Sequence, residues 1–150
     1  MYVRDLMQRE VATLEFSDTL DLASDIMTLG RIRHMPVVSG GTVVGILSQR
    51  DLFRAAVSSL LGLGPMAERE WLAKVPVRTV MTARVFTVPP SASVRSAVNI
   101  MLDKRIGCLP VVDEGALVGL VSESDCLRHL AHVLRISETK EDLPELAAPA

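Results

Sequence analysis

The chain has 150 residues, of which 49% are hydrophobic and only 3% aromatic, and its formal net charge is -2. This length can form one compact body, but so few aromatic side chains leave little surface for stacking single-stranded nucleic acid, and the acidic balance disfavours a broad surface for polyanions. No apolar run approaches the about 18 residues that cross a membrane, and the first residues lack the apolar segment of a secretory signal. We therefore predict a cytoplasmic protein that binds neither nucleic acid nor a membrane.

The first elements predicted along the chain are a turn, a strand and a helix. An apolar turn at residues 3–7 precedes a short strand at residues 11–14. From Leu20 onward, apolar residues recur at helical spacing. Ser17 or Asp18 can cap the N-terminus of this helix, because a short polar side chain there accepts a hydrogen bond from a free backbone N–H.

A hairpin and a second helix follow. Two runs rich in β-branched residues, at 34–38 and 42–47, are separated by the turn residues 39–41 and predict an antiparallel pair of strands. Their nearly continuous Val, Ile and Leu content indicates that both faces of the sheet are covered. Ser48 begins an amphipathic helix that we expect to end near Leu61.

After a linker, the same series of elements begins again. We assign residues 1–62 to the first motif, 63–76 to a linker with a short helix at 67–72, 77–136 to the second motif and 137–150 to a polar tail that we expect to be mobile. Ser91 or Ser93 is the expected cap of the first long helix of the second motif. The other expected elements are a turn at 77–81, strands at 85–88, 108–112 and 116–121, a helix from Val94, and a last helix from Ser122 to about Ile136.

The recurrence extends to residue identity. Residues 3–54 align with residues 77–128 without a gap, and roughly 20 of about 52 positions are identical. Two copies are too few for a solenoid, which needs at least three repeats to bury a continuous core. They instead favour a pseudo-twofold pair with clefts where the halves meet. The best-matched stretches are Met35–Val38 with Leu109–Val112 and Val44–Asp51 with Val118–Asp125.

The repeated pattern resembles a known domain family. Each motif has the order strand, helix, strand, strand, helix. It carries Pro-Val-Val in the middle strand and Gly-x-x-Ser-x-x-Asp at the start of the last helix. This pattern is similar to the cystathionine-β-synthase (CBS) domain, and two such motifs in tandem resemble a CBS pair. The resemblance covers nearly all of residues 3–135. It implies an α/β fold of the α+β type, with two β-α-β-β-α motifs related by a pseudo-twofold and small sheets packed on helices. It also implies a homodimer that regulates an unknown protein target, without catalysis and without a required cofactor, by binding AMP, ADP, ATP or an S-adenosyl-type ligand.

The starts of the last helix of each motif are candidate binding sites. Each start has a serine and an aspartate three residues apart, namely Ser48 with Asp51 and Ser122 with Asp125. At a helix start, free backbone N–H groups and the helix dipole favour an anion. A carboxylate can also accept hydrogen bonds from two vicinal hydroxyls, which a ribose presents. The alternative is a helix cap, with serine as N-cap and an acid three residues later; capping and binding are compatible. By the resemblance, Asp51 and Asp125 bind ribose, and Ser48, Ser122, Arg50 and Ser124 contact phosphate or ribose hydroxyls.

Basic residues next to the hairpin strands are candidate phosphate ligands. Arg31, Arg33 and His34 precede Met35-Pro36, where members of the family often carry phosphate-contacting residues. The second motif has Gly107 in place of Arg33 and a cysteine in place of His34, so we expect the two clefts to differ. The alternative is a solvated cluster of surface charges. Lys104, Arg105 and Arg128 are the basic residues that can compensate in the second motif.

An adenine ring requires an apolar slot, and the family resemblance places eight residues around it. Most of these side chains are also ordinary core residues, so a purely structural role is the alternative. Gly45 and Gly119 are more simply explained by close approach of another backbone segment. The eight candidate adenine residues are Thr13, Leu14, Met35, Ile46, Thr87, Val88, Leu109 and Leu120.

Two other classes of function have weaker support. Cys126, His129 and His132 have the side chains that zinc accepts, but positions i, i+3 and i+6 drift around a helix, so we predict no metal site. No Ser/His/Asp arrangement or nucleophile elbow stands out, so we predict that the protein is not an enzyme. A dimerisation module that acts only through protein contacts, using the apolar helices and the linker residue Trp71, is the main alternative, and a metal- or redox-responsive protein that also uses Cys108 is a weaker one. In a reducing compartment the cysteines are most simply buried thiols.

Overall fold

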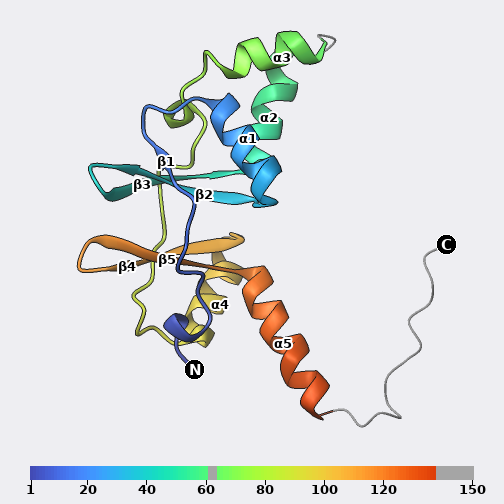
Figure 1. The fold of residues 1–150 in the computed structure, drawn as a ribbon. Coiled ribbons are helices and arrows are strands. Elements are labelled where there is room, and N and C mark those ends of the chain that lie inside the picture. Colours follow the sequence, from blue (N-terminus) through green and yellow to red (C-terminus); the bar gives the residue numbers. More distant parts are fainter. Residues whose placement is uncertain (61–63, 138–150) are drawn as a thin grey trace, which may run out of the picture.

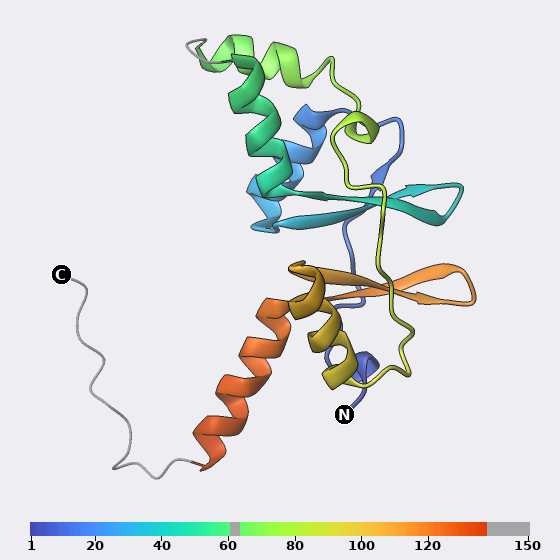
Figure 2. The same cartoon turned by 180° about the vertical axis from the view of Figure 1, so that it is seen from behind.

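Two similar α/β halves stack with their sheets facing each other and their helices on the outside (Figure 1). The computed structural model describes residues 1–60 and 64–137. Viewed from behind, the same arrangement is seen, with β2 and β3 opposite β4 and β5 across the middle of the molecule (Figure 2). The mixed fold with small sheets packed on helices is the fold class expected from the repeat.

The elements follow the predicted order in both halves. In the first half they are the 3-10 turn η1 (Val3–Asp5), β1 (Leu14–Glu15), α1 (Leu20–Gly30), β2 (His34–Ser39), β3 (Thr42–Ser48) and α2 (Gln49–Leu60), followed by α3 (Pro65–Leu72). In the second half they are the 3-10 turn η2 (Val77–Thr79), α4 (Val94–Lys104), β4 (Cys108–Asp113), β5 (Ala116–Ser122) and α5 (Glu123–Ser137). Residue 61, where the first amphipathic helix was expected to end, and the tail from residue 138 lie outside the described residues.

Both predicted hairpins are confirmed. β2 pairs antiparallel with β3, and β4 with β5, in matching registers that set Pro36 opposite Ile46 and Pro110 opposite Leu120. Each hairpin carries a register shift, or β-bulge, after its first valine of the Pro-Val-Val motif. The outer face of each sheet packs on helices, and β3 contacts β5 across the inner side.

The first strand of each motif is shorter than predicted. β1 comprises only Leu14 and Glu15, which pair in parallel with β2, so the strand expected at 11–14 is wrong for its first three residues. In the second motif, only Val88 forms a bridge, to Val111. Two prolines follow Val88, and proline has no N–H with which to extend a ladder.

One of the two expected helix caps is confirmed. Ser93 caps α4, because its Oγ accepts the Ser96 N–H at 3.0 Å. The N-cap of α1 is instead Thr19, whose hydroxyl donates to Asp21, so neither Ser17 nor Asp18 caps this helix. The carboxylate of Asp18 accepts the N–H of Glu15 and so stabilises the preceding turn.

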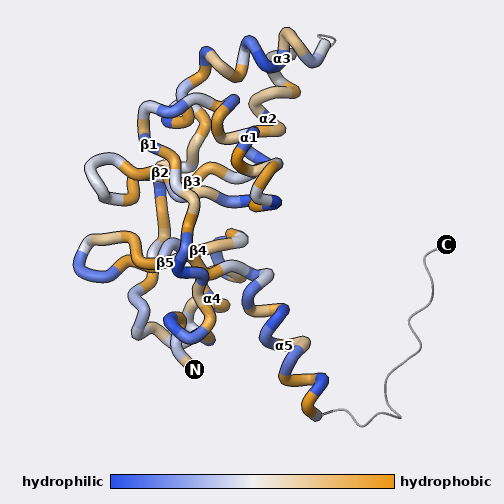
Figure 3. Tube along the Cα trace, viewed as in Figure 1, coloured by the Kyte–Doolittle hydropathy of each residue, from blue (hydrophilic) through white to orange (hydrophobic). Residues whose placement is uncertain are grey.

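The N-terminal turns of the two motifs are exchanged between the halves. Val3 and Met7 are buried in the core of the second half, whereas Val77 is buried in the core of the first. Paired backbone hydrogen bonds hold each crossing segment, with Gln8 against Leu120 at 2.8 and 2.9 Å and Thr82 against Ile46 at 2.8 and 3.0 Å. As Figure 3 shows, hydrophobic stretches run through the strands that these segments cross.

Gly45 and Gly119 allow this exchange. A Cβ added at Gly119 would lie 2.8 Å from the carbonyl oxygen of Gln8 and from the sulfur of Met7, and one at Gly45 would overlap the Met81 side chain. Gly119 can therefore accept a larger residue only if the crossing backbone moves away, and Gly45 only if the Met81 side chain shifts. This confirms that the repeated glycines serve close approach of another part of the chain.

Candidate functional site

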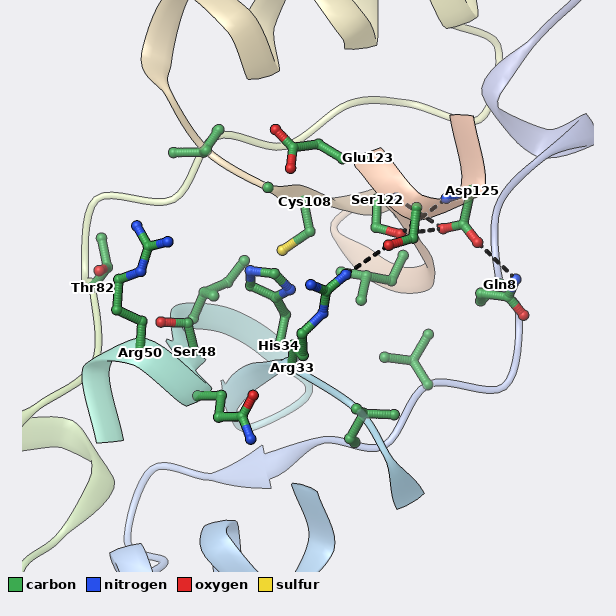
Figure 4. A pocket seen from close by; sticks show the side chains of 18 of the residues that line it. Gln8, Arg33, His34, Ser48, Arg50, Thr82, Cys108, Ser122, Glu123 and Asp125 are labelled. Carbon is green, nitrogen blue, oxygen red and sulfur yellow. Dashed lines mark hydrogen bonds between the residues drawn. The ribbon is translucent and has the colours of Figure 1, made fainter. Parts of the chain in front are cut away.

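A cleft of about 1440 Å³ lies between the halves and is lined by residues of both. Its walls come from the ends of β3 and β5, the first turns of α2 and α5, and the two crossing segments at residues 8–12 and 82–86. Small-molecule sites in proteins measure roughly 300–1,000 Å³, so this cleft has room for a nucleotide. Both predicted Ser/Asp pairs line it, as do several of the predicted basic residues. Figure 4 shows the central part of the cleft.

Ser48 and Asp51 form a reciprocal cap at the start of α2. The Asp51 N–H donates to Ser48 Oγ at 3.0 Å, while Asp51 Oδ2 accepts from the Ser48 N–H at 3.0 Å and the Ser48 hydroxyl at 2.8 Å. The predicted capping role is therefore confirmed. Within residues 1–60 and 64–137, no side chain or backbone group donates to Asp51 Oδ1.

Asp125 has the same cap at the start of α5 and two further partners. Its Oδ2 accepts from the Ser122 N–H at 2.9 Å and the Ser122 hydroxyl at 2.7 Å. Its Oδ1 accepts from Gln8 Nε2 at 3.0 Å and from Arg128 Nη1 at 3.1 Å. Only 6% of Asp125 is exposed. Burial alone would raise its pKa, but the hydrogen bonds from Ser122 and Gln8 and the charge of Arg128 outweigh burial and lower it.

Side chains of the first half bridge the middle of the cleft. Arg33 Nη2 donates to the hydroxyl of Ser124 on α5 at 2.7 Å. His34 reaches across to Gly107, where an added Cβ would lie 3.2 Å from its Cε1 and 3.3 Å from its Nε2. The two motifs differ here because the ring of His34 occupies the space that a side chain at position 107 would need. In Figure 4, Arg33 and His34 lie between Ser48 with Arg50 on one side and Ser122 with Asp125 on the other.

The predicted phosphate ligands divide into cleft residues and one that lies elsewhere. Arg31, Arg33, His34, Arg50, Arg105 and Arg128 line the cleft, whereas Lys104 does not and instead has its ammonium 5.3 Å from the ring of Phe86. Sequence reasoning missed three charged lining residues: Glu123, and Glu10 and Arg84, which occupy equivalent positions of the repeat. Six arginines and four carboxylates line the cleft, an excess of two positive charges.

Of the candidate adenine residues, Ile46 and Leu120 line the cleft. Four others are buried in the two cores, and two are exposed away from the cleft lining. The apolar wall of the cleft instead includes Val11, Val85 and Phe86, which sequence reasoning did not select. The signal available for them was the repeat itself, because positions 11 and 85 are identical and lie in the crossing segments. The buried four are Leu14, Met35, Val88 and Leu109, and the exposed two are Thr13 and Thr87.

The side chains considered for metal or redox chemistry do not form one cluster. Among the described residues, no group of three or more His, Cys, Asp or Glu side chains is arranged to hold a metal ion. His129 and His132 line a separate hollow of about 260 Å³ next to Asp125. Burial raises the pKa of Cys108 to about 12 and also raises that of Cys126, so both thiols are poor nucleophiles near neutral pH.

The repeated halves match a known family. Residues 3–58 and 77–132 each match the CBS domain. A CBS domain-containing protein of Dictyostelium discoideum is 33% identical over 88% of this chain and 92% of its own length. The chain spans 54% of a Methanocaldococcus jannaschii protein that is 30% identical to it, so a similar region also occurs within a longer protein. In the described part of the chain, no helix combines the length and the apolar character needed to cross a membrane.

Solved structures share the fold. The crystal structure of AcuB from Vibrio cholerae has a TM-score of 0.75 and 33% sequence identity, and the match covers 96% of this chain and 98% of that one. The CBS domain pair of protein MJ0100, solved in complex with 5'-methylthioadenosine and S-adenosyl-L-methionine, has a TM-score of 0.74 and 24% identity over 87% of this chain and 99% of that one. At that identity the second match establishes the fold.

Proposed function

This chain belongs to the CBS-domain family, and we propose that its pair of domains is a regulatory module that binds an adenosyl compound, preferably an adenine nucleotide, in the cleft between the halves. Binding then changes the relative stability of two conformations or the affinity for a protein target. Such a shift requires only that the ligand binds the two states with unequal affinity. The role is regulatory rather than catalytic.

The observation that carries the proposal is the second carboxylate oxygen of Asp51, at the start of α2, to which none of the described residues donates. One oxygen of Asp51 is held by Ser48, which fixes the direction of the other. A carboxylate fixed in this way can accept hydrogen bonds from the vicinal hydroxyls of a ribose. The MJ0100 pair was solved with two adenosyl compounds, which supports the same ligand class here.

The charges of the cleft favour a phosphate over a cationic sulfonium. Arginine donates two parallel hydrogen bonds to phosphate oxygens, and Arg50 directly precedes Asp51 in the first turn of α2. The positive end of the α2 helix dipole, at this helix start, adds a further attraction for anions. The excess of arginines over carboxylates would repel the sulfonium of S-adenosylmethionine.

Isothermal titration of the full chain with AMP, ADP, ATP and S-adenosylmethionine tests this proposal. We expect saturable binding of at least one nucleotide, tighter than binding of S-adenosylmethionine. Asp51→Asn keeps the shape of the side chain but removes its charge, and should weaken binding about tenfold, because hydrogen bonds to a charged group contribute about 1.5–3 kcal/mol. Glu68→Gln on α3 is a control that changes the net charge equally at a position outside the cleft lining.

The outcome that contradicts the proposal is the absence of saturable heat with all four compounds. A ligand stabilises the state that it binds, so melting temperatures that ignore the same compounds would agree with that outcome. The remaining function would then be dimerisation through protein contacts alone.

We further propose that the module forms a homodimer through α2 and α5. Phe53 on α2 and Leu127 on α5 are 67% and 64% exposed, and they occupy equivalent positions of the repeat. Equivalent apolar patches on two helices suit an isologous interface, in which the same surface of each copy faces the other.

A further inference from the structure

The two carboxylates of the repeat differ in what already binds them. Asp51 keeps Oδ1 without a donor among the described residues, whereas both oxygens of Asp125 are fully engaged. Gln8 and Arg128 together donate to the very oxygen that a ribose would need. The second Ser/Asp pair therefore lines the cleft but is occupied by the protein itself.

The source of this difference is one residue in each crossing segment. Gln8 and Thr82 occupy equivalent positions of the repeat, and their backbones pair in the same way with β5 and β3, at Leu120 and Ile46. The backbone therefore brings both side chains to the same place relative to the nearby carboxylate. Gln8 carries an amide on two methylenes and reaches Asp125 at 3.0 Å, while the Thr82 hydroxyl is on Cβ and makes no hydrogen bond to Asp51.

Arg128 alone does not explain the difference. Its equivalent in the first motif is Arg54, which has the same spacing from Asp51 that Arg128 has from Asp125. Only Arg128 pairs with its aspartate, at 3.1 Å. Since both motifs carry this arginine, the glutamine is the residue whose chemistry distinguishes the two ends of the cleft.

Resting on the proposed function, we infer that Gln8 closes the Asp125 end of the cleft and leaves one adenosyl site per chain, at Asp51. Gln8 acts as a specificity-determining residue, because its amide takes the hydrogen-bonding position of a ribose hydroxyl. The charges of the crossing segments agree with this division. At the open end, Arg84 stands two positions after Thr82. At the closed end, Glu10 stands two positions after Gln8 and would repel a phosphate.

A reciprocal exchange of the two residues tests the inference. Isothermal titration should use whichever of AMP, ATP or S-adenosylmethionine binds the wild-type chain most tightly. We expect one ligand per chain in the wild type, two in Gln8→Thr, and binding at least about tenfold weaker in Thr82→Gln, whose new amide would cover Asp51. The double variant Gln8→Thr with Thr82→Gln should bind one ligand and depend on Asp125 instead of Asp51.

A ligand-free measurement tests the same contact separately. In NMR titrations of the side-chain carboxyls, Gln8→Thr should raise the pKa of Asp125, because it removes a donor to the charged form. Circular dichroism of each variant verifies that the fold is retained.

The possible failures are distinguishable. If no compound binds the wild type, the proposed function fails. If the wild type binds two ligands per chain, or if Gln8→Thr weakens binding instead of adding a site, the proposed function stands and the inference about Gln8 is overturned. An unchanged pKa of Asp125 in Gln8→Thr would also overturn it.

Discussion

His34 lies where the two halves meet, and its surroundings disfavour the charged imidazolium. Burial, followed by the neighbouring charge of Arg33, lowers the pKa of His34 below its ordinary value of 6.5, although Glu123 and Asp51 act in the opposite direction. The ring packs against Gly107 rather than pointing into solvent. The neutral side chain therefore belongs to the folded state.

This burial predicts a specific pH dependence of stability. Between its lowered folded pKa and 6.5, His34 binds more protons in the unfolded chain, so the free energy of unfolding increases with pH in that window. The contribution is complete above about pH 6.5 and is lost as the pH falls below that value, with a slope of at most about 1.4 kcal/mol per pH unit for one group. Urea unfolding at a series of pH values from 5 to 8 measures it.

His34→Gln should flatten this pH dependence, because glutamine does not titrate. Equal slopes for the wild type and His34→Gln would contradict the role of the buried ring.

At this scale, residue types and spacing predicted the two Ser/Asp caps of the candidate site but not the contact that distinguishes them. The Ser/Asp pairs could be found from sequence because a helix cap is a local motif, and the structure confirms both caps. Gln8 could not be found, since its contact with Asp125 joins residues 117 positions apart. Core and cleft residues of the same hairpin are equally apolar, so Met35 on β2 could not be separated from Ile46 on β3 by composition alone.

Among the elements, α5 exposes a row of large apolar side chains. After its first turns the helix extends away from the sheet of its own half (Figure 1). Leu127, Leu130 and Leu134 share one face of α5 and are 64%, 50% and 47% exposed. We call these three side chains the leucine face. Because these leucines are already about half buried, a second copy that covers them could recover roughly half of the about 1.5–3 kcal/mol that full burial of such a side chain contributes.

The homodimer proposal predicts that a charge on the leucine face separates the copies. Leu130→Glu should weaken the dimer at least about a hundredfold, since burying an unpaired carboxylate costs several kcal/mol. Sedimentation equilibrium of wild-type protein and variant measures the change in association. His132→Glu adds the same negative group on the opposite side of α5 and should leave association as in the wild type. A wild-type chain that sediments as a monomer would contradict the proposal.

The elements themselves were largely predictable, and their exceptions have physical causes. Helical periodicity and the turns at residues 39–41 and 113–115 identified the helices and hairpins, because these signals are local. The strand at 11–14 was overestimated because Val11 and Ala12 belong to the crossing segment that lines the cleft, and the pairing with β2 begins only at Leu14. Apolar character at Val11 thus reflects the cleft rather than a strand.

At the scale of the whole molecule, the exchange of N-terminal turns makes each half depend on the other copy of the repeat. The core of the first half includes Leu72 and Val77, while Val3 and Met7 complete the core of the second. The motif boundaries drawn from the repeat describe how the sequence is duplicated. Each packed core instead contains side chains from both copies of the repeat. Sequence periodicity does not reveal this exchange, because the two N-terminal turns are equally apolar.

This division predicts which fragments fold. Residues 12–82 contain β1 to α3 together with Val77 and Met81, which fill the first core and cover Gly45. Residues 1–62 lack those side chains and carry Val3 and Met7 without the core into which they pack. We therefore expect fragment 12–82 to unfold cooperatively on heating and fragment 1–62 to lack a thermal transition, as measured by circular dichroism at 222 nm.

The size of the effect follows from the buried side chains that fragment 1–62 lacks. Val77 is fully buried and Leu72 is 7% exposed, and burying such side chains contributes about 1.5–3 kcal/mol each. Since whole domains are stable by only about 5–15 kcal/mol, losing both side chains and the cover over Gly45 removes a large part of that stability. Val77→Ala in fragment 12–82 should accordingly lower its melting temperature, whereas the exposed Arg78→Ala should not. If fragment 1–62 folded as stably as fragment 12–82, the exchanged N-terminal turns would not be essential to the two cores, and the predicted dependence of each half on the other copy of the repeat would be wrong.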